Sequence, residues 1–231
     1  MASQSPIQRF AIIGLGRFGS RLAANLTAAG QEVIAVDQDI QRVDQIRDRV
    51  TLAVAMDATD EQAMRGQGVD QVDVAVVGIG DDFQARVLST VTLKQMGVAK
   101  VISRAVARTD ADIMRRVGAD DVVNPEDESA DRWAVRLANP WFLSCVELDA
   151  DHSIIEINTP KKWVDKTLIQ LAVRKNFGVH VVAIKHRFEN AQGAVEINPF
   201  LQIPIPDQPL GAHDVLVVMG GDAQLSQVGQ G

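Results

Sequence analysis

The segment Gly14-Leu15-Gly16-Arg17-Phe18-Gly19 most constrains how this chain can fold. It follows a short apolar run at residues 10–13 and opens a helix-length stretch at residues 17–29. In such a strand–turn–helix unit the first glycine permits the tight turn, the second lets the backbone approach a pyrophosphate, and the third lets helix and strand pack closely. The helix N-terminus then offers free N–H groups and a partial positive charge to an anion. The segment therefore predicts a phosphate-binding turn.

Short apolar runs alternate with helix-length stretches through the first half of the chain. The predicted strands cover residues 10–13, 32–36, 51–55, 72–77, 100–103 and 121–123. The predicted helices include residues 17–29, 82–96, 110–117 and 126–138. Most of the strands are apolar almost throughout, which is typical of a parallel sheet covered on both faces. The alternation predicts an α/β, Rossmann-like doubly wound domain over residues 1–142, with right-handed crossovers.

Residues at the expected helix ends support this reading. Asp60 and Asp110 are the residue type that caps helix N-termini, and we expect both to do so. Gly30, Gly97 and Gly118 each follow a predicted helix, where a left-handed residue commonly ends it.

The pattern changes from about Cys145 onward. Residues 146–149 and 153–157 alternate apolar and polar side chains, as strands with one face in water do. A short helix at about 168–175, strands at 179–184 and 214–219, and an exposed loop at 186–193 complete the pattern. We expect a second, small α+β domain at residues 143–231.

Composition excludes several classes of function. The formal net charge is −7 and no Lys/Arg run is present, which argues against a nucleic-acid partner. A single cysteine excludes a disulfide framework, and the four histidines show no metal-ligand spacing. Residues 1–6 lack the basic and apolar regions of a signal peptide, and the apolar runs are shorter than the ~20 residues of a membrane span. We therefore expect a soluble, cytoplasmic protein.

Asp37 and Arg17 are the first candidate ligand contacts outside the glycines. Asp37 ends the second predicted strand, eighteen residues after Gly19, where a carboxylate can accept hydrogen bonds from ribose hydroxyls and repel a 2′-phosphate. Its alternative role is a helix cap. Arg17 lies within the turn and has a planar guanidinium suited to phosphate oxygens, or it is a solvated first-turn residue.

Two further segments follow predicted strands, at the sheet edge where ligands bind. Asp57-Ala58-Thr59-Asp60 follows the third strand, and Asp57 either meets the ribose or adenine or caps the next helix. Gly78-Ile79-Gly80 follows the fourth strand and either approaches the base or turns the chain. The expected nucleotide-binding residues are Gly14, Leu15, Gly16, Arg17, Phe18, Gly19, Asp37, Asp57, Ala58, Thr59, Gly78, Ile79, Gly80 and Arg104.

Several of these segments together resemble the RCK domains that regulate potassium transport. They are the glycine turn, Asp37, residues 57–60 and Gln84-Ala85. Residues 117–126 and 183–186 narrow the resemblance to the KtrA group of the TrkA family, and the similarity runs from about residue 9 to residue 222. It covers both predicted domains, the second as an RCK-C domain.

The resemblance implies a cytoplasmic regulatory subunit without enzymatic activity, lying at the inner face of the plasma membrane. Members form homodimers that assemble into a homo-octameric ring beneath a membrane-embedded potassium-transporter subunit. They bind ATP or ADP, and NAD(H) in some members, with ATP favouring ion flux. Arg17 matches an arginine that reaches the terminal phosphate. Glu126 matches a glutamate that helps hold Mg²⁺ or another cation there across the dimer interface, although it also fits an ordinary first-turn glutamate.

In some relatives the RCK-C domain binds cyclic di-AMP, and residues 146–157 and 179–184 fit its dimer surface. The pocket residues for this ligand have no residue-by-residue match in the chain.

Two other functions are compatible with a nucleotide-binding turn. A nicotinamide-dependent oxidoreductase needs a proton donor such as a His–carboxylate or Tyr–Lys pair. The chain has no Tyr, and its nearest candidate pair is Asp151-His152 on an expected turn. The other alternative is a stand-alone nucleotide or redox sensor.

Overall fold

The computed structural model describes residues 7–189, 195–197 and 201–229. The chain divides into two compact units, Met1–Glu128 and Ser129–Gly231. Helix α6 (Pro125–Ala138) contains the point of division. The domain limit at residue 142 lies just beyond this helix and stays a prediction.

The first unit is the predicted α/β sheet domain. Its parallel strands have the order β3-β2-β1-β4-β5-β6. They span β1 (Arg9–Ile13), β2 (Glu32–Asp37), β3 (Leu52–Ala55), β4 (Val74–Val77), β5 (Lys100–Arg104) and β6 (Asp121–Val123). The helices are α1 (Arg17–Ala28), α2 (Ile40–Ile46), α3 (Glu61–Gly66), α4 (Phe83–Gln95) and α5 (Arg108–Arg116). This order confirms the doubly wound, Rossmann-like fold.

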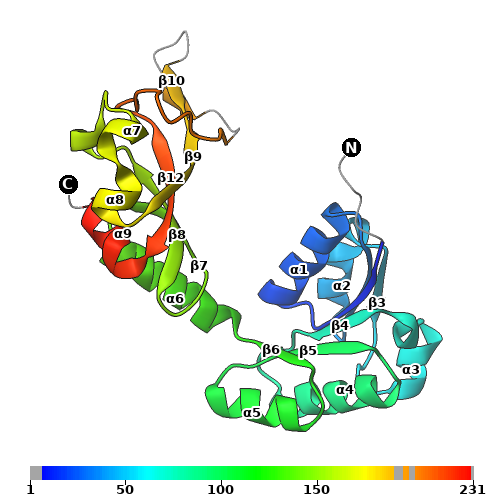
Figure 1. Ribbon diagram of the computed structural model, residues 1–231. Helices are drawn as coiled ribbons and strands as arrows, with labels where there is room; N and C mark the ends of the chain where they lie inside the picture. Colours follow the sequence, from blue (N-terminus) through cyan, green and yellow to red (C-terminus); the bar gives the residue numbers. More distant parts are fainter. Residues whose placement is uncertain (1–6, 190–194, 198–200, 230–231) are drawn as a thin grey trace. The chain divides into compact units, whose positions relative to one another are not determined.

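Apolar side chains alternate between the two faces of this sheet and build a core on each. Ile12, Val33 and Ala35 pack with residues of α1 and α2, whereas Ala11 and Ile13 pack with residues of α3 and α4. Figure 1 shows α1 and α2 on one side of the sheet and α3 and α4 on the other. Because both faces are covered, the strands need apolar residues at nearly every position.

The strand order reverses at β1, which lies between β2 and β4. The chain winds toward β3 in one direction and toward β6 in the other, and ligands of such sheets bind beyond the carboxyl ends of the strands at this point. The glycine turn follows β1 and the Gly78–Gly80 segment follows β4, so both lie at this point of the sheet.

The helix ends match the predictions except at one position. Gly30, Gly97 and Gly118 have φ of +82°, +87° and +108°, as expected. Asp60 caps α3 by accepting a hydrogen bond from the Ala63 N–H at 3.0 Å. The prediction for Asp110 is wrong, because α5 begins at Arg108 with Ala107 as its N-cap. The Asp110 carboxylate instead pairs with Arg86.

The second unit is the predicted α+β domain. Its antiparallel sheet has the order β7-β8-β12-β9. The strands span β7 (Phe142–Glu147), β8 (His152–Asn158), β9 (His180–Lys185) and β12 (Val215–Gly221). The helices are α7 (Leu168–Leu171), α8 (Val173–Phe177) and α9 (Asp222–Gly229). Buried residues of these helices, including Leu171, Val173 and Leu225, share one apolar core with residues of the sheet.

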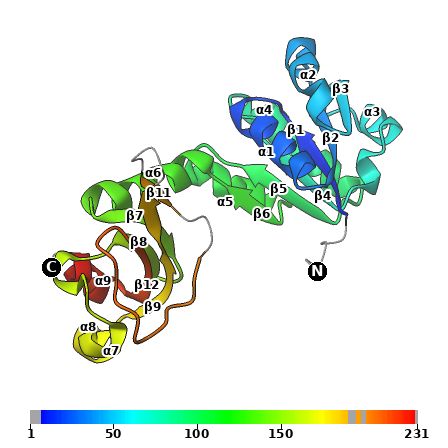
Figure 2. The ribbon, with the colours of Figure 1, turned by 90° about the horizontal axis from the view of Figure 1, so that it is seen from above.

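Several details of the second unit differ from the sequence prediction. The predicted helix at 168–175 is interrupted at Ala172, which has φ of +44° and separates α7 from α8. Part of the predicted loop forms β10 (Arg187–Glu189), which pairs with β11 (Val195–Ile197), while residues 190–193 lie outside the described residues. Residues 201–214, in orange in Figure 2, lead back to the sheet and form a bridge between Gln202 and Ile184. Helix α9 had no predicted counterpart.

Among the described parts of the chain, no helix combines the length and apolar character needed to cross a membrane.

Candidate functional site

The glycine turn packs tightly against the loop that follows β4. Gly14 has φ of +92°, and its N–H donates to the Val36 carbonyl at 2.7 Å. A Cβ at this position would lie 2.9 Å from the Ile79 nitrogen. The Gly78 N–H donates to the Ile13 carbonyl at 2.7 Å. Gly14 is therefore required both by its backbone conformation and by the neighbouring loop.

Gly19 and Gly16 have different reasons to be glycine. A Cβ on Gly19 would overlap the Gly14 carbonyl oxygen, so the close approach of α1 to the turn requires glycine. Gly16 is the N-cap of α1, with φ of −64°, and a Cβ there would meet nothing within 4 Å. The protein itself therefore does not require glycine at position 16. The open space lies at a helix N-terminus, where free N–H groups favour an anion.

Asp37 holds the turn in place through its side chain. One carboxylate oxygen accepts from the Leu15 N–H at 2.6 Å and the other accepts from the Asp39 N–H at 2.9 Å. The Arg42 Nη1 lies 3.5 Å from the Asp37 Oδ2, and the Asp37 side chain is only 10% exposed. Each carboxylate oxygen can accept a second hydrogen bond. The ribose role of Asp37 therefore stays a prediction, alongside a structural role that the contacts establish.

Asp57 forms a local turn rather than a helix cap. Its Oδ1 accepts from both the N–H and the hydroxyl of Thr59, each at 2.8 Å. Since Asp60 caps α3, the capping alternative for Asp57 is wrong. Ala58 is buried between them. Contact of these residues with a ligand stays a prediction.

The loop after β4 makes room for Arg104. A Cβ on Gly80 would lie 2.8 Å from the Arg104 Nη1, so a larger residue would displace the guanidinium. Arg104, at the end of β5, donates from Nη2 to the Glu126 carboxylate at 2.6 Å. The Arg104 side chain is 16% exposed and that of Glu126 is 58% exposed.

Charged groups from distant parts of the chain gather beside the turn. The hydrogen bond from Arg104 lowers the pKa of the Glu126 carboxyl, and the positive charge of Arg17 lowers it further. Arg17, Arg104 and Glu126 therefore share one electrostatic environment within a single chain. Guanidinium groups such as those of Arg17 and Arg104 are suited to phosphate oxygens.

The donor set does not form a metal cage by itself. Among residues 7–189, 195–197 and 201–229, no group of three or more His, Cys, Asp or Glu side chains could hold a metal ion. Glu126 contributes one carboxylate, and Mg²⁺ is commonly held by one or two carboxylates together with substrate phosphates and water. The residues therefore fit a cation only together with a bound phosphate.

Arg86 is a charged residue near this site that the sequence interpretation missed. It lies on α4 and is 1% exposed. Its spacing to Ser89, Thr90 and Leu93, all fully buried, places it on the inward face of the helix. That spacing is a signal that could have identified it.

The second unit contains a cavity of about 320 Å³ next to α7, α8 and β9. It is lined by Leu168, Ala172, Val173, Arg174, Lys175, Val179, His180 and Val181. A lining that combines apolar side chains with Arg174 and Lys175 is suited to an anion that carries an apolar part.

Comparison with known protein families identifies two domains. Residues 10–125 match the TrkA-N domain and residues 152–230 match the TrkA-C domain. The chain is 31% identical over 220 residues to Ktr system potassium uptake protein C of Bacillus subtilis (strain 168), covering 95% of each protein. It is 30% identical over 213 residues to Ktr system potassium uptake protein A of the same organism, covering 92% of this chain and 91% of that protein.

Solved structures share the fold at lower identity. The GsuK RCK domain superposes with a TM-score of 0.53 and 23% identity, over 98% of this chain but only 46% of that chain. The GsuK channel bound to NAD gives a TM-score of 0.52 and 23% identity, over 98% of this chain and 38% of that chain. The chain thus spans less than half of these larger proteins, and the similarity concerns the fold.

Proposed function

Because this chain belongs to the TrkA family, we propose that it is a regulatory subunit of a potassium uptake system, controlled by an adenine nucleotide bound at the glycine turn. The observation that carries the proposal is the ion pair between Arg104 and Glu126, whose carboxyl pKa is also lowered by the charge of Arg17 in the glycine turn. The two Ktr relatives are potassium uptake proteins by name, and each aligns over more than nine-tenths of its length.

The charges beside the turn suggest how ATP and ADP could act differently. ATP carries one more phosphate, and Arg17 and Arg104 are the cations available to neutralise it. Glu126 would help to hold a Mg²⁺ ion, which would supply further positive charge beside the phosphates. A ligand shifts a conformational equilibrium only through a difference in its affinity for the two states, and couplings of about 1–3 kcal/mol are typical.

A binding experiment tests the nucleotide proposal. We expect ATP and ADP to bind the purified chain in calorimetry and to raise its melting temperature, with NADPH binding more weakly because Asp37 repels a 2′-phosphate. Arg17→Ala should weaken the binding of ATP more than the binding of ADP. Arg116→Ala, which removes an exposed arginine from the end of α5, is the matched control and should leave both affinities unchanged. Equal weakening of ATP and ADP by Arg17→Ala would refute the terminal-phosphate role.

The membrane partner and the assembly extend the same proposal. We expect homodimers that form an octameric ring at the inner face of the plasma membrane, bound to a membrane-embedded potassium-transporter subunit. Light scattering of the purified chain gives the assembly mass. Potassium flux into vesicles that contain the transporter subunit, with and without this chain, tests control. A monomer at all concentrations, or flux that does not respond to the chain, contradicts this part.

The cavity in the second unit is a candidate site for cyclic di-AMP. Its cations, Arg174 and Lys175, suit phosphates, and its apolar lining suits the bases. We expect saturable binding of cyclic di-AMP in calorimetry, weakened by Arg174→Ala and unchanged by Lys162→Ala, an exposed lysine outside the cavity lining. Absence of saturable binding would remove this ligand from the proposal.

An NAD-dependent oxidoreductase is the contrasting function. NAD(H) is also a candidate ligand of the regulatory site, because the GsuK channel has been solved bound to NAD. His152, the candidate proton donor, is exposed and its Nδ1 lies 3.0 Å from Asp149 Oδ1. We propose no catalytic role for it. Hydride transfer to NAD with candidate substrates would contradict the regulatory function.

A further inference from the structure

Arg86 is a charged side chain placed almost entirely inside the first unit. It lies in the first turn of α4, four residues after the N-cap Asp82, and its side chain is 2% exposed. Burial lowers the pKa of its guanidinium, while the nearby Asp110 carboxylate opposes that shift. An arginine in such a place must be paired with acceptors, because an unpaired buried charge is strongly unfavourable.

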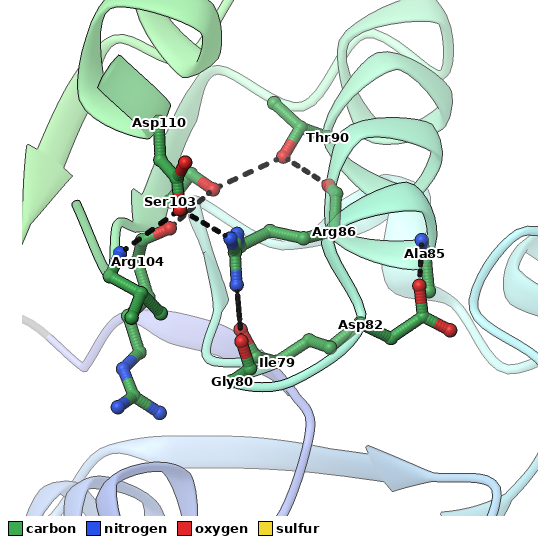
Figure 3. Close-up of polar contacts among 10 residues, drawn as sticks. Ile79, Gly80, Asp82, Ala85, Arg86, Thr90, Ser103, Arg104 and Asp110 are labelled. Atoms are coloured by element: carbon green, nitrogen blue, oxygen red, sulfur yellow. Dashed lines mark hydrogen bonds and ion pairs between the residues drawn. The ribbon is translucent and has the colours of Figure 1, made fainter. Parts of the chain in front are cut away.

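The guanidinium joins three segments that are separate along the chain. Its Nη1 donates to the Ile79 carbonyl at 2.9 Å and to the Gly80 carbonyl at 2.6 Å. Its Nη2 donates to the Asp110 carboxylate on α5 at 2.9 Å. Figure 3 shows the guanidinium between the two carbonyls on one side and Asp110 on the other. The Arg86 side chain is 2% exposed and that of Asp110 is 21% exposed, and we refer to the two as the buried pair because the guanidinium is enclosed.

The two carbonyls belong to the loop that shapes the candidate site. The Ile79 nitrogen lies where a Cβ on Gly14 would approach it to 2.9 Å, so the loop touches the glycine turn. Gly80 lies directly against the Arg104 guanidinium. Arg86 therefore binds the carbonyl groups of the same two residues whose other atoms lie against the glycine turn and Arg104.

Stability alone does not explain why this space is filled by the buried pair, because burial of the Arg86 charge costs desolvation free energy. Two apolar side chains of similar volume often stabilise a protein as well as a buried ion pair does, since they need no desolvation of charge. A guanidinium, in contrast, fixes the orientation of carbonyl groups through its rigid set of donors. Apolar residues in place of the pair would not fix the orientation of the Ile79–Gly80 backbone, because they donate no hydrogen bonds to its carbonyls.

We propose that Arg86 is a positioning residue for nucleotide binding, which sets the Ile79–Gly80 backbone and thereby places Arg104 at the phosphates. This inference rests on the proposed function, because it assigns Arg86 to the same nucleotide site. Arg86 does not itself contact the ligand. Its effect passes through Arg104.

The test separates stability from positioning. In the double variant Arg86→Met/Asp110→Leu, apolar side chains replace both members of the buried pair. We expect a melting temperature near that of the wild type and an ATP dissociation constant raised at least about tenfold, the loss of one charge-assisted hydrogen bond. Lys94→Met is the matched control. It breaks the ion pair between Lys94, at the other end of α4, and Asp120, and it should leave ATP affinity unchanged.

A double-mutant cycle with Arg104→Ala tests the route of the effect. If Arg86 acts through Arg104, Arg86→Met should weaken ATP binding in the wild type but change it less than about twofold in the Arg104→Ala background. Equal effects in both backgrounds would overturn the inference, and so would wild-type ATP affinity in the apolar double variant.

If the apolar double variant does not fold, Arg86→Lys serves instead. Lysine keeps the charge but has no planar fork to hold two carbonyls and Asp110 together. We expect the same weakening of ATP, and wild-type affinity for Arg86→Lys would overturn the inference. The wild-type titration separates the two proposals: no ATP binding by the wild type refutes the proposed function and with it this inference, whereas binding that is indifferent to Arg86 refutes the inference alone.

Discussion

Substitution of Gly16 by alanine would show whether the open space beside the turn receives a phosphate. The position has φ of −64°, and a Cβ there would meet no protein atom within 4 Å. Gly→Ala at a compatible position stabilises a protein by about 0.4–1 kcal/mol through the unfolded chain. Alanine is a poorer N-cap than glycine, by a comparable amount. We therefore expect the free energy of unfolding to change by less than about 0.5 kcal/mol.

The effect on a bound phosphate is much larger. A methyl group at Gly16 would fill the space through which an anion approaches the first N–H groups of α1. Loss of one hydrogen bond to a charged group is worth about 1.5–3 kcal/mol, or roughly 10- to 100-fold in affinity. The substitution should thus weaken ATP binding strongly while the stability of the protein stays unchanged.

Calorimetry with ATP and thermal melting of the same samples give the two quantities. Gly66→Ala is the matched control, because a Cβ there also meets nothing within 4 Å and the residue lies at the end of α3. It should leave ATP affinity unchanged. Wild-type ATP affinity in Gly16→Ala would show that no phosphate approaches this residue. A fall in melting temperature of more than about 4 °C would show that the space is not open, since 1 kcal/mol shifts the melting temperature by about 2–4 °C in a chain of this size.

Three other outcomes follow from the structure. Gly19→Ala should destabilise the protein by about 1–3 kcal/mol in denaturant unfolding, because its Cβ would overlap the Gly14 carbonyl; unchanged stability would contradict the packing. Asp37→Ala should cost about 1–3 kcal/mol, since the Leu15 N–H loses a charged acceptor, and a neutral result would leave only a ligand role. Hydrogen bonds from Lys94 and then from the Val101 N–H hold the pKa of Asp120 below its ordinary value of 3.8. Its stabilisation is therefore full above that value and is lost as pH falls through the lower folded pKa, so the melting temperatures of wild type and Asp120→Asn should converge below about pH 4.

The fold of the first unit could be predicted from the sequence because its signals are local. Runs such as residues 32–36 are apolar at nearly every position, and a parallel strand covered on both faces requires that. The glycine turn could also be found, because a tight turn between strand and helix leaves room for few residues other than glycine at positions 14 and 19. The left-handed helix ends at Gly30, Gly97 and Gly118 follow the same rule.

Residues with two available partners could not be placed in this way. Asp110 has the residue type and spacing of an N-cap, yet its carboxylate pairs with Arg86, twenty-four residues away. Ala172 adopts a left-handed conformation between α7 and α8, although alanine favours continuing a helix. For Asp110 this tertiary contact outweighs a local capping preference of about 1 kcal/mol.

The sequence by itself thus determined the alternation of strands and helices in the first unit and the glycine turn between β1 and α1. The tertiary structure alone decided that Arg104 meets Glu126, that Gly80 leaves room for Arg104, and that Arg86 supports this loop from inside. The physical reason is the range of the interactions. Backbone conformation and apolar burial depend on neighbouring residues, whereas ion pairs between separate elements exist only after the sheet has brought the ends of β4 and β5 side by side.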